Sequence, residues 1–277
     1  MENLIVGSAA WRSNYGISNS ELSQKELNDI FNCLKNYEIK TIDTAESYGD
    51  TEKVLHEHDL SLNIHTKVSP FINQYEFETK LSEIDDSSVE IVYFHDHKIF
   101  DAFSIDQIKE FVEKIISRGF KPGFSLYEVH DFMRALDHFH DKAYFQLPLH
   151  IFDLKFIKIL NESIKEKVIF RSLLIRGLIF LRNTEIKNYL QKDYYYAKQK
   201  FEKAYQLKFE KASFTQLTYS LISLLNKKNI KFTIGLNSPN EIMSFIEEVK
   251  SANSKLIDWN AIIEESNTII PIEKINI

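Results

Sequence analysis

The sequence is poor in the features that mark several protein classes. It holds one cysteine, Cys33, which cannot form a disulfide within the chain, so we expect a reducing, cytoplasmic environment and interpret Cys33 as packing. It has no block of lysine and arginine and a net charge of −6, which argues against a nucleic-acid partner. It also lacks an apolar run of about 18 residues and a basic, apolar leader, so we expect neither a membrane span nor a signal peptide.

What the chain does contain is a regular alternation of two patterns. With 44% hydrophobic and 27% charged residues over 277 positions it is typical of a globular protein with ample core. Short β-type runs recur, and segments with helical periodicity separate them. The eight runs are 3–7, 40–43, 62–68, 89–94, 120–125, 143–148, 167–172 and 231–235.

Eight strands that alternate with helices predict parallel strands and an α/β fold. Residues 104–119, for example, place Ile105, Ile108, Phe111, Val112, Ile115 and Ile116 on one helical face. The number of strands and the length favour a single-domain (β/α)8 TIM barrel over residues 1–277, since such barrels run to about 250 residues. An open doubly wound sheet is the alternative.

One connection, over about 173–230, is much longer than the others and is interpreted as an insertion between strands 7 and 8. It contains a helical pattern over about 184–209 and a second over 213–229, for which Ser213 is a plausible N-cap. A further helix is expected near 256–266. Several glycines fall at or just past the predicted strand ends, where backbone turns or approaches a ligand: Gly7, Gly49, Gly123, Gly177 and Gly235.

Four ionisable residues lie at the ends of three neighbouring strands. Asp43 ends the second strand and Tyr48 follows it, Lys67 ends the third, and His95 ends the fourth. In a barrel these side chains would meet at the catalytic face. Each also has a structural interpretation. Asp43 could cap the next helix and Tyr48 could fill a packing space. Lys67 could extend its ammonium to solvent, and His95 could be a hydrogen-bonded structural histidine. Together they suit proton transfer, because an ammonium lowers the pKa of a neighbouring phenol and a carboxylate holds the ammonium in place.

An ordered series of motifs resembles the aldo-keto reductase family over nearly the whole chain. The motifs are "GSAAW", "IDTAESYGDTEKVL", "HTKV", "VYFHD", "GFSLY", "FQLPLHIFD", "RSLLIRGLIF" and "TIGLNSPNEI". The resemblance implies a barrel that uses NADP(H) or NAD(H) to reduce an aldehyde or ketone. It implies that Tyr48 is the proton donor, that Lys67 and Asp43 tune it, and that His95 orients the carbonyl.

The resemblance also implies a set of cofactor-binding positions, some of which depart from the family pattern. These positions are Gly7, Ser8, Ser125, Gln146, Arg171, Ser172, Arg176, Gly177, Gly235, Asn237 and Ser238. Leu126 stands where the family usually has asparagine, Arg171 where many members stack a tyrosine on the nicotinamide, and Asn237 at the usual arginine position. Ser238 is either near the adenosine 2′-phosphate or only the N-cap of the last helix.

The resemblance implies a small carbonyl compound as substrate, and neither its identity nor the oligomeric state is predicted. Part of the sequence resembles a bacterial branch associated with sugars, and Trp11 and Tyr15 could line a pocket for a ring-bearing, sugar-type substrate. Two alternatives stay open. The first is a metal-dependent hydrolase built on the histidines of His95-Asp96-His97, although we expect no metal site. The second is a catalytically silent barrel that binds a nucleotide or a partner.

Overall fold

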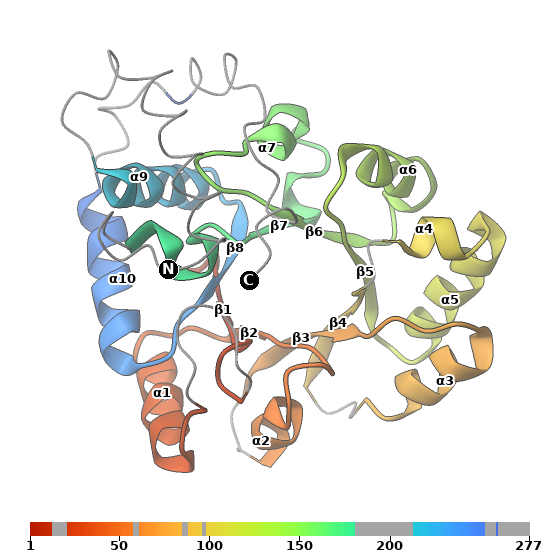
Figure 1. Ribbon diagram of the computed structural model, residues 1–277, viewed down its shortest axis with the longest axis horizontal. Helices are drawn as coiled ribbons and strands as arrows, with labels where there is room; N and C mark the ends of the chain where they lie inside the picture. The colour runs from red at the N-terminus through yellow and green to blue at the C-terminus, as the bar shows by residue number, and fades with distance from the viewer. Residues whose placement is uncertain are drawn as a thin grey trace.

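The chain forms a closed barrel of eight parallel strands that follow one another in sequence order (Figure 1). This computed structural model describes residues 1–12, 21–57, 61–84, 88–95, 98–180, 213–252 and 259. The strands are β1 (Leu4–Gly7), β2 (Thr41–Asp43), β3 (Asn63–Val68), β4 (Val89–Phe94), β5 (Lys121–Ser125), β6 (Tyr144–Pro148), β7 (Val168–Arg171) and β8 (Lys231–Gly235). Because β8 pairs with β1, the predicted TIM barrel is confirmed and the open sheet is excluded.

Helices lie around the outside of the barrel (Figure 1). They are α1 (Gln24–Asn36), α2 (Thr51–Glu57), α3 (Gln74–Ser82), α4 (Ile99–Ala102), α5 (Ile105–Ser117), α6 (Val129–Phe139), α7 (Lys155–Ile159), α9 (Phe214–Lys227) and α10 (Pro239–Ser251), with the 3-10 helices η1 (Lys165–Lys167) and η2 (Ile175–Phe180). Among the described residues no helix is both long enough and apolar enough to cross a membrane.

Two helices begin where the sequence predicts. Ser104 and Ser213 each form a capping box, in which the serine oxygen accepts from the backbone three residues on and that residue's glutamine side chain binds back to the serine N–H. The predicted apolar face of α5 is buried at Ile108, Phe111, Val112 and Ile115, whereas Ile105 is half-buried and Ile116 is 37% exposed.

The long connection between β7 and β8 is described only at its two ends, as η2 and α9. The helix predicted over 184–209 lies outside the described residues, and so does the helix predicted over 256–266 apart from Trp259. The extent of the insertion and the assignment of residues 1–277 to one domain therefore stay predictions.

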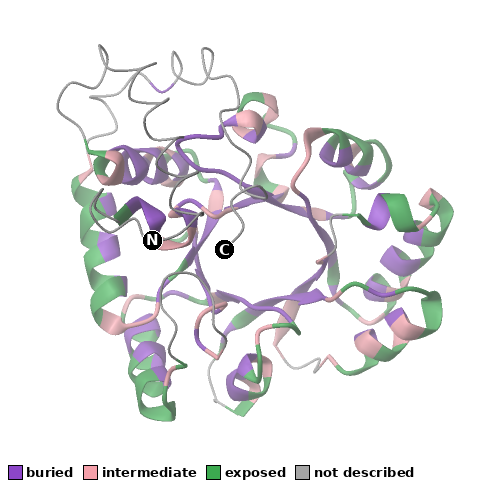
Figure 2. Cartoon of the chain, viewed as in Figure 1, coloured by how far each residue is buried: buried purple, intermediate pink, exposed green. Residues whose placement is uncertain are grey.

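Alternation along the strands separates an inner layer of side chains from an outer one. Side chains of successive strand residues point to opposite faces, so every second residue faces the barrel axis. Inside the barrel, Ile5, Ile91, Tyr93 and Ile169 form a compact cluster. The intervening residues, such as Val92, belong to the larger core between strands and helices, which Figure 2 shows as buried inner helix faces.

Phenylalanine fills much of that outer core. The ring centres of Phe94 on β4 and Phe124 on β5 lie 5.1 Å apart, and those of Phe124 and Phe139 on α6 also lie 5.1 Å apart. Phe77 on α3 and Phe111 on α5 lie 4.8 Å apart. These contacts hold the helices against the strands that carry the polar residues of the barrel mouth.

Gly123 has a packing role inside the barrel rather than a role at a strand end. It lies within β5, and a Cβ at this position would be 2.3 Å from Cδ1 of the fully buried Tyr93 ring. The prediction that Gly123 marks a strand end is therefore wrong. Only glycine leaves room for the Tyr93 ring in the inner layer.

Replacing Gly123 should destabilise the barrel by overpacking. We expect Gly123→Ala to lower the free energy of unfolding by about 1–3 kcal/mol or more, because the Tyr93 ring has no solvent-exposed space into which to move. Gly235→Ala is the matched control, since its nearest obstacle is the Gly7 carbonyl oxygen at 3.9 Å. Urea unfolding measures both, and equal stability of the two variants would contradict the packing argument.

Candidate active site

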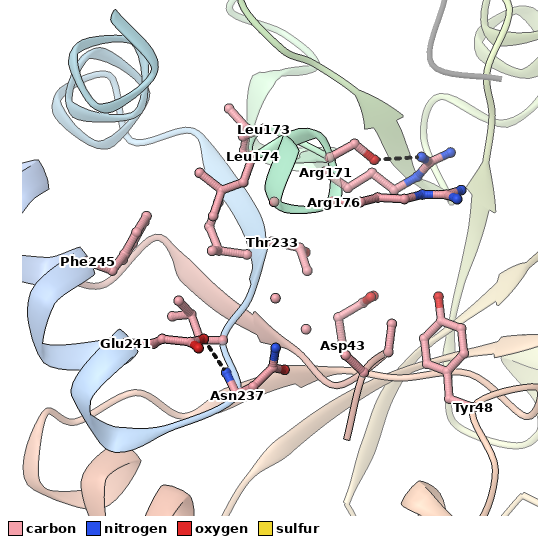
Figure 3. A pocket seen from close by; sticks show the side chains of 18 of the residues that line it. Asp43, Tyr48, Arg171, Leu173, Leu174, Arg176, Thr233, Asn237, Glu241 and Phe245 are labelled. Atoms are coloured by element: carbon pink, nitrogen blue, oxygen red, sulfur yellow. Dashed lines mark hydrogen bonds between the residues drawn. The ribbon is translucent and has the colours of Figure 1, made fainter. Parts of the chain in front are cut away.

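A cavity of about 720 Å³ opens at the carboxyl ends of the strands. It is bounded by residues from the barrel mouth, from η2 and from the first turns of α10 (Figure 3). The predicted site residues that line it are Gly7, Asp43, Tyr48, Lys67, His95, Ser125, Gln146, Arg171, Ser172, Arg176, Gly177, Gly235 and Asn237. The fold therefore gathers all the predicted catalytic residues, and all the predicted cofactor residues except Ser8 and Ser238, around one space.

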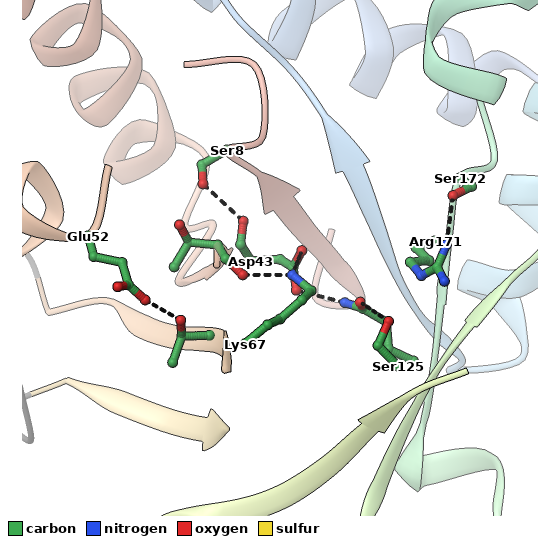
Figure 4. A network of polar contacts seen from close by, with 10 residues as sticks. Ser8, Asp43, Glu52, Lys67, Ser125, Arg171 and Ser172 are labelled. Atoms are coloured by element: carbon green, nitrogen blue, oxygen red, sulfur yellow. Dashed lines mark hydrogen bonds and ion pairs between the residues drawn. The ribbon is translucent and has the colours of Figure 1, made fainter. Parts of the chain in front are cut away.

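A buried polar network forms the floor of this cavity (Figure 4). The Lys67 ammonium donates to Asp43 Oδ2 at 2.7 Å and to the Thr44 carbonyl at 2.6 Å. The Gln146 amide donates to the other carboxylate oxygen of Asp43 at 2.7 Å, and Ser125 Oγ lies 3.5 Å from Gln146 Oε1. Burial lowers the pKa of Lys67, and the Asp43 carboxylate opposes that shift by favouring the charged ammonium.

Tyr48 lies beside this network and beside His95. Lys67 Nζ is 5.3 Å from the centre of the Tyr48 ring, and the Tyr48 and His95 rings are 6.0 Å apart in an edge-to-face arrangement. The loop that carries Tyr48 depends on Gly49, which has φ +66°, and a Cβ there would be 2.4 Å from the Arg12 carbonyl oxygen. The glycine next to the tyrosine thus permits the turn that brings the phenol to the lysine.

His95 extends the barrel mouth beyond β4. Its backbone N–H donates to the Val68 carbonyl at 3.0 Å, which fixes the start of the loop. Burial, followed by the nearby charges of Lys67 and Arg171, lowers the pKa of His95 to about 4. The imidazole is therefore neutral near pH 7, where it can donate one hydrogen bond into the cavity.

Arg171 ends β7 and stacks on an aromatic ring that the sequence analysis missed. Its guanidinium carbon lies 4.1 Å from the centre of the Tyr127 ring, and Nη1 donates to Ser172 Oγ at 3.2 Å. Nε and Nη2 are buried without a partner among the described residues. Tyr127 also lines the cavity, and its position two residues after Ser125 at the end of β5 is the signal that could have identified it.

The segment after β7 adopts a backbone that is uncommon for side chains other than glycine. Ser172, Ile175 and Arg176 have φ values of 66°, 50° and 53°, and Gly177 has φ 90°. Such conformations cost free energy and cluster at ligand-binding sites. The bend brings Ser172, Arg176 and Gly177 to the cavity wall.

The first turn of α10 forms the far end of the cavity. Ser238 Oγ accepts the Glu241 N–H at 3.2 Å, so Ser238 is the N-cap of the helix. It does not line the cavity, which favours the second of the two interpretations, and its contact with a cofactor stays a prediction. Glu241 does line the cavity, and its carboxylate accepts the Asn237 N–H at 2.8 Å.

Two other predicted residues, Ser8 and Trp11, do not line the cavity. Ser8 is buried and donates to the Asp43 carbonyl at 3.1 Å, so its hydroxyl supports β2 instead. Trp11 is fully buried, donates to the Leu236 carbonyl at 3.0 Å and packs edge-on against Phe31. It is a core residue, and its assignment to a substrate pocket is wrong. Tyr15 lies outside the described residues.

The described residues hold no group of three or more histidine, cysteine, aspartate or glutamate side chains that could bind a metal ion. His97, the second histidine of the hydrolase alternative, lies outside the described part of the chain. Leu126 is buried in the core and does not line the cavity, so it adds no polar group there.

Solved structures that are similar to this chain include aldo-keto reductases, whereas no family model and no curated protein sequence matches it. A candidate aldo-keto reductase from Pseudomonas aeruginosa has a TM-score of 0.62 at 12% identity over 90% of each chain. An aldo-keto reductase from a Medee basin deep-sea metagenome library has a TM-score of 0.57 at 17% identity, covering 98% of this chain and 93% of its own. A mutant of Gox0644 in complex with NADPH has a TM-score of 0.57 at 14% identity, covering 95% of this chain and 88% of its own. The predicted resemblance is thus confirmed at the level of the fold.

Acidification should destabilise the protein through His95. Its pKa is about 4 in the folded protein, against 6.5 for an unperturbed histidine, so between these values the unfolded chain binds a proton that the folded chain does not. The free energy of unfolding should therefore fall as the pH drops from about 6.5 to 4, by at most roughly 3 kcal/mol from this residue. His95→Asn should remove that part of the dependence.

Urea unfolding of the wild type and of His95→Asn across this pH range measures the effect. Burial lowers the pKa of His150 to about 3, and His150 contributes to both proteins, so the difference between the two curves isolates His95. Parallel curves would show that His95 is not desolvated as described.

Proposed function

We propose that this protein is an aldo-keto reductase that reduces a small aldehyde or ketone to an alcohol with a reduced nicotinamide cofactor. The observation that carries the proposal is the position of the Tyr48 ring next to both the Lys67 ammonium and the neutral His95 imidazole in one cavity. We also propose a cytoplasmic location, because the single cysteine is buried and free.

The cavity suits a long, anionic cofactor. It extends from Tyr48 to the first turn of α10, and glycines at the ends of β1 and β8 keep side chains out of its wall. Ser125 and Gln146 would hold the nicotinamide end, and Ser172, Arg176 and Gly177 the phosphates. Arginine side chains and unusual backbone turns suit phosphate oxygens. When bound, the cofactor supplies a hydride to the carbonyl carbon.

The residues around Tyr48 would supply the proton and orient the carbonyl. Tyr48 donates its hydroxyl proton to the carbonyl oxygen as the hydride arrives. The Lys67 ammonium stabilises the phenolate that remains, and Asp43 fixes the position of that ammonium. His95 donates a hydrogen bond to the same carbonyl oxygen and so holds the carbonyl toward Tyr48.

A catalytically silent barrel is the second candidate. Three departures from the family pattern favour this candidate. Leu126 adds no polar group to the cavity, where the family usually has asparagine. Arg171 and Asn237 stand where the family usually has tyrosine and arginine. Cofactor binding without turnover of any carbonyl would favour it over the reductase.

Removal of the Tyr48 hydroxyl should abolish most activity while leaving the fold and cofactor binding intact. We expect Tyr48→Phe to lower kcat/KM by about 100-fold or more, the usual scale for general acid catalysis. Lys67→Met should also lose activity, because the phenolate loses its stabilising charge. Tyr37→Phe is the control, since Tyr37 ends α1 and does not line the cavity. Full activity of Tyr48→Phe would mean that another group donates the proton.

The second prediction concerns the choice between NADPH and NADH. Asn237 has a neutral side chain and stands where the resemblance places an arginine near the 2′-phosphate. The Glu241 carboxylate lines the same end of the cavity. Three lysines that could have compensated do not line the cavity: Lys227 and Lys228 lie at the end of α9, and Lys231 starts β8 at the opposite end of the strand. We therefore expect NADPH to be preferred over NADH by well below 10³-fold, because a neutral hydrogen bond from Asn237 to the 2′-phosphate is weaker than a charge-assisted bond from arginine.

Glu241→Gln tests the electrostatic part of this prediction. It keeps an acceptor for the Asn237 N–H and removes one negative charge, which should raise the NADPH affinity relative to NADH about five- to tenfold. Glu247→Gln is the matched control on the exposed side of α10. Fluorescence titration with both cofactors measures the ratio. A wild-type preference of about 10³ or more would contradict the prediction, as would an unchanged ratio in Glu241→Gln.

A further inference from the structure

The Arg171 guanidinium has one edge that makes no hydrogen bond to the described residues. Nη1 donates to Ser172 Oγ, whereas Nε and Nη2 are screened from solvent and have no acceptor. These two nitrogens share the edge of the planar fork that can donate two parallel N–H bonds to one carboxylate. Buried donors of a charged group are costly when they stay unpaired, so this edge is suited to an acceptor that a ligand brings.

The cavity offers no free carboxylate to neutralise this charge near Tyr48 among the described residues. Asp43 already binds Lys67 and Gln146 through its two oxygens. Burial is the main reason for the low pKa of Lys67 and of His95, and the Arg171 charge lowers both further, so its positive charge acts on the catalytic residues. An anionic ligand group at Arg171 would offset the unpaired charge in a place where solvent screens it little.

The direction of the side chain indicates which ligand meets it. Arg171 ends β7, yet its guanidinium stacks on Tyr127, which follows β5, and so it extends away from β8 and α10. In Figure 3 the Arg171 head lies on the side of the cavity where Tyr48 stands, whereas Asn237, Glu241 and Phe245 lie on the other side. The nicotinamide, to which the resemblance assigns Arg171, carries no negative charge, so an anionic group that meets Arg171 belongs to the carbonyl substrate bound near Tyr48.

We infer that the substrate is an aldehyde or ketone that also carries a carboxylate, and that Arg171 binds the carboxylate through Nε and Nη2. This inference rests on the proposed carbonyl reduction and adds the class of substrate to it. The carboxylate is unchanged by the reaction: the hydride adds to the carbonyl carbon, and the proton from Tyr48 adds to the carbonyl oxygen. Arg171 is thus a specificity-determining residue that distinguishes keto and aldehyde acids from neutral carbonyl compounds.

The test compares 4-formylbenzoate with its methyl ester, which has the same ring and aldehyde but no charge. Wild-type protein should reduce the acid with a kcat/KM about 10- to 100-fold higher than the ester, as expected for a bidentate charged pair. Arg171→Met should bring the two substrates within about threefold of each other, mainly through a higher KM for the acid. Arg171→Lys keeps the charge without the fork and should give an intermediate ratio.

A control variant and a binding measurement keep this outcome separate from the proposed reaction. Arg134→Met removes an arginine that also stacks on an aromatic ring, Phe100 at 5.3 Å, but does not line the cavity, and it should keep the wild-type ratio. Calorimetry with benzoate and benzamide reports the anion site without turnover. Benzoate should bind the wild type at least about tenfold more tightly than benzamide, and Arg171→Met should lose the difference.

Two results would overturn the inference. One is equal binding of benzoate and benzamide to the wild type, whether or not any carbonyl is reduced. The other is an acid preference that persists in Arg171→Met. Reduction of neither substrate, together with Arg171-dependent benzoate binding, would instead contradict the proposed reduction and leave the anion site supported.

Discussion

The candidate site depends on one buried ion pair, between Lys67 and Asp43. Both charges lie inside the barrel, and removing either partner would leave the other as an unpaired buried ion, which is strongly destabilising. The pair forms at 2.7 Å because β2 and β3 are neighbours and both side chains face the barrel axis at the strand ends. Gln146 holds the second Asp43 oxygen from β6, on another side of the barrel. The ammonium is thereby fixed next to the Tyr48 ring.

The same pair determines the charge balance of the whole cavity. Both Asp43 oxygens already accept hydrogen bonds, from Lys67 and from Gln146, so Asp43 does not neutralise Arg171. Nε and Nη2 of Arg171 therefore remain available to a ligand. At the far end the charge has the opposite sign, since the Glu241 carboxylate accepts the Asn237 N–H and lines the cavity. The cavity is thus positive near the reacting group and negative near α10. This pattern favours an anionic substrate and weakens the attraction for a 2′-phosphate.

The sequence predicts the barrel and the inward-facing residues of the site because both follow from short-range rules. Strands alternate with helices, and every second strand residue faces inward, so Asp43 and Lys67 come together once closure is assumed. Ser125 and Gln146 are predicted from the resemblance alone. The predictions for Trp11 and Gly123 are wrong because the roles of these residues depend on three-dimensional packing. Trp11 is aromatic like a pocket residue, but its ring fills the core beside Phe31, and Gly123 makes room for the Tyr93 ring on a neighbouring strand. The contact between Arg171 and Tyr127 joins residues far apart in the chain, so no local pattern reveals it.

Transfer of hydride to a carbonyl is the central claim, and isotope transfer tests it most directly. The protein is incubated with dihydronicotinamide cofactor that carries deuterium at the transferable C4 position, together with neutral and carboxylate-bearing aldehydes and ketones. Mass spectrometry and NMR then locate the label. The account predicts an alcohol with deuterium on its carbinol carbon, formed only when protein and cofactor are both present. Saturable cofactor binding with no deuterium in any alcohol would contradict it.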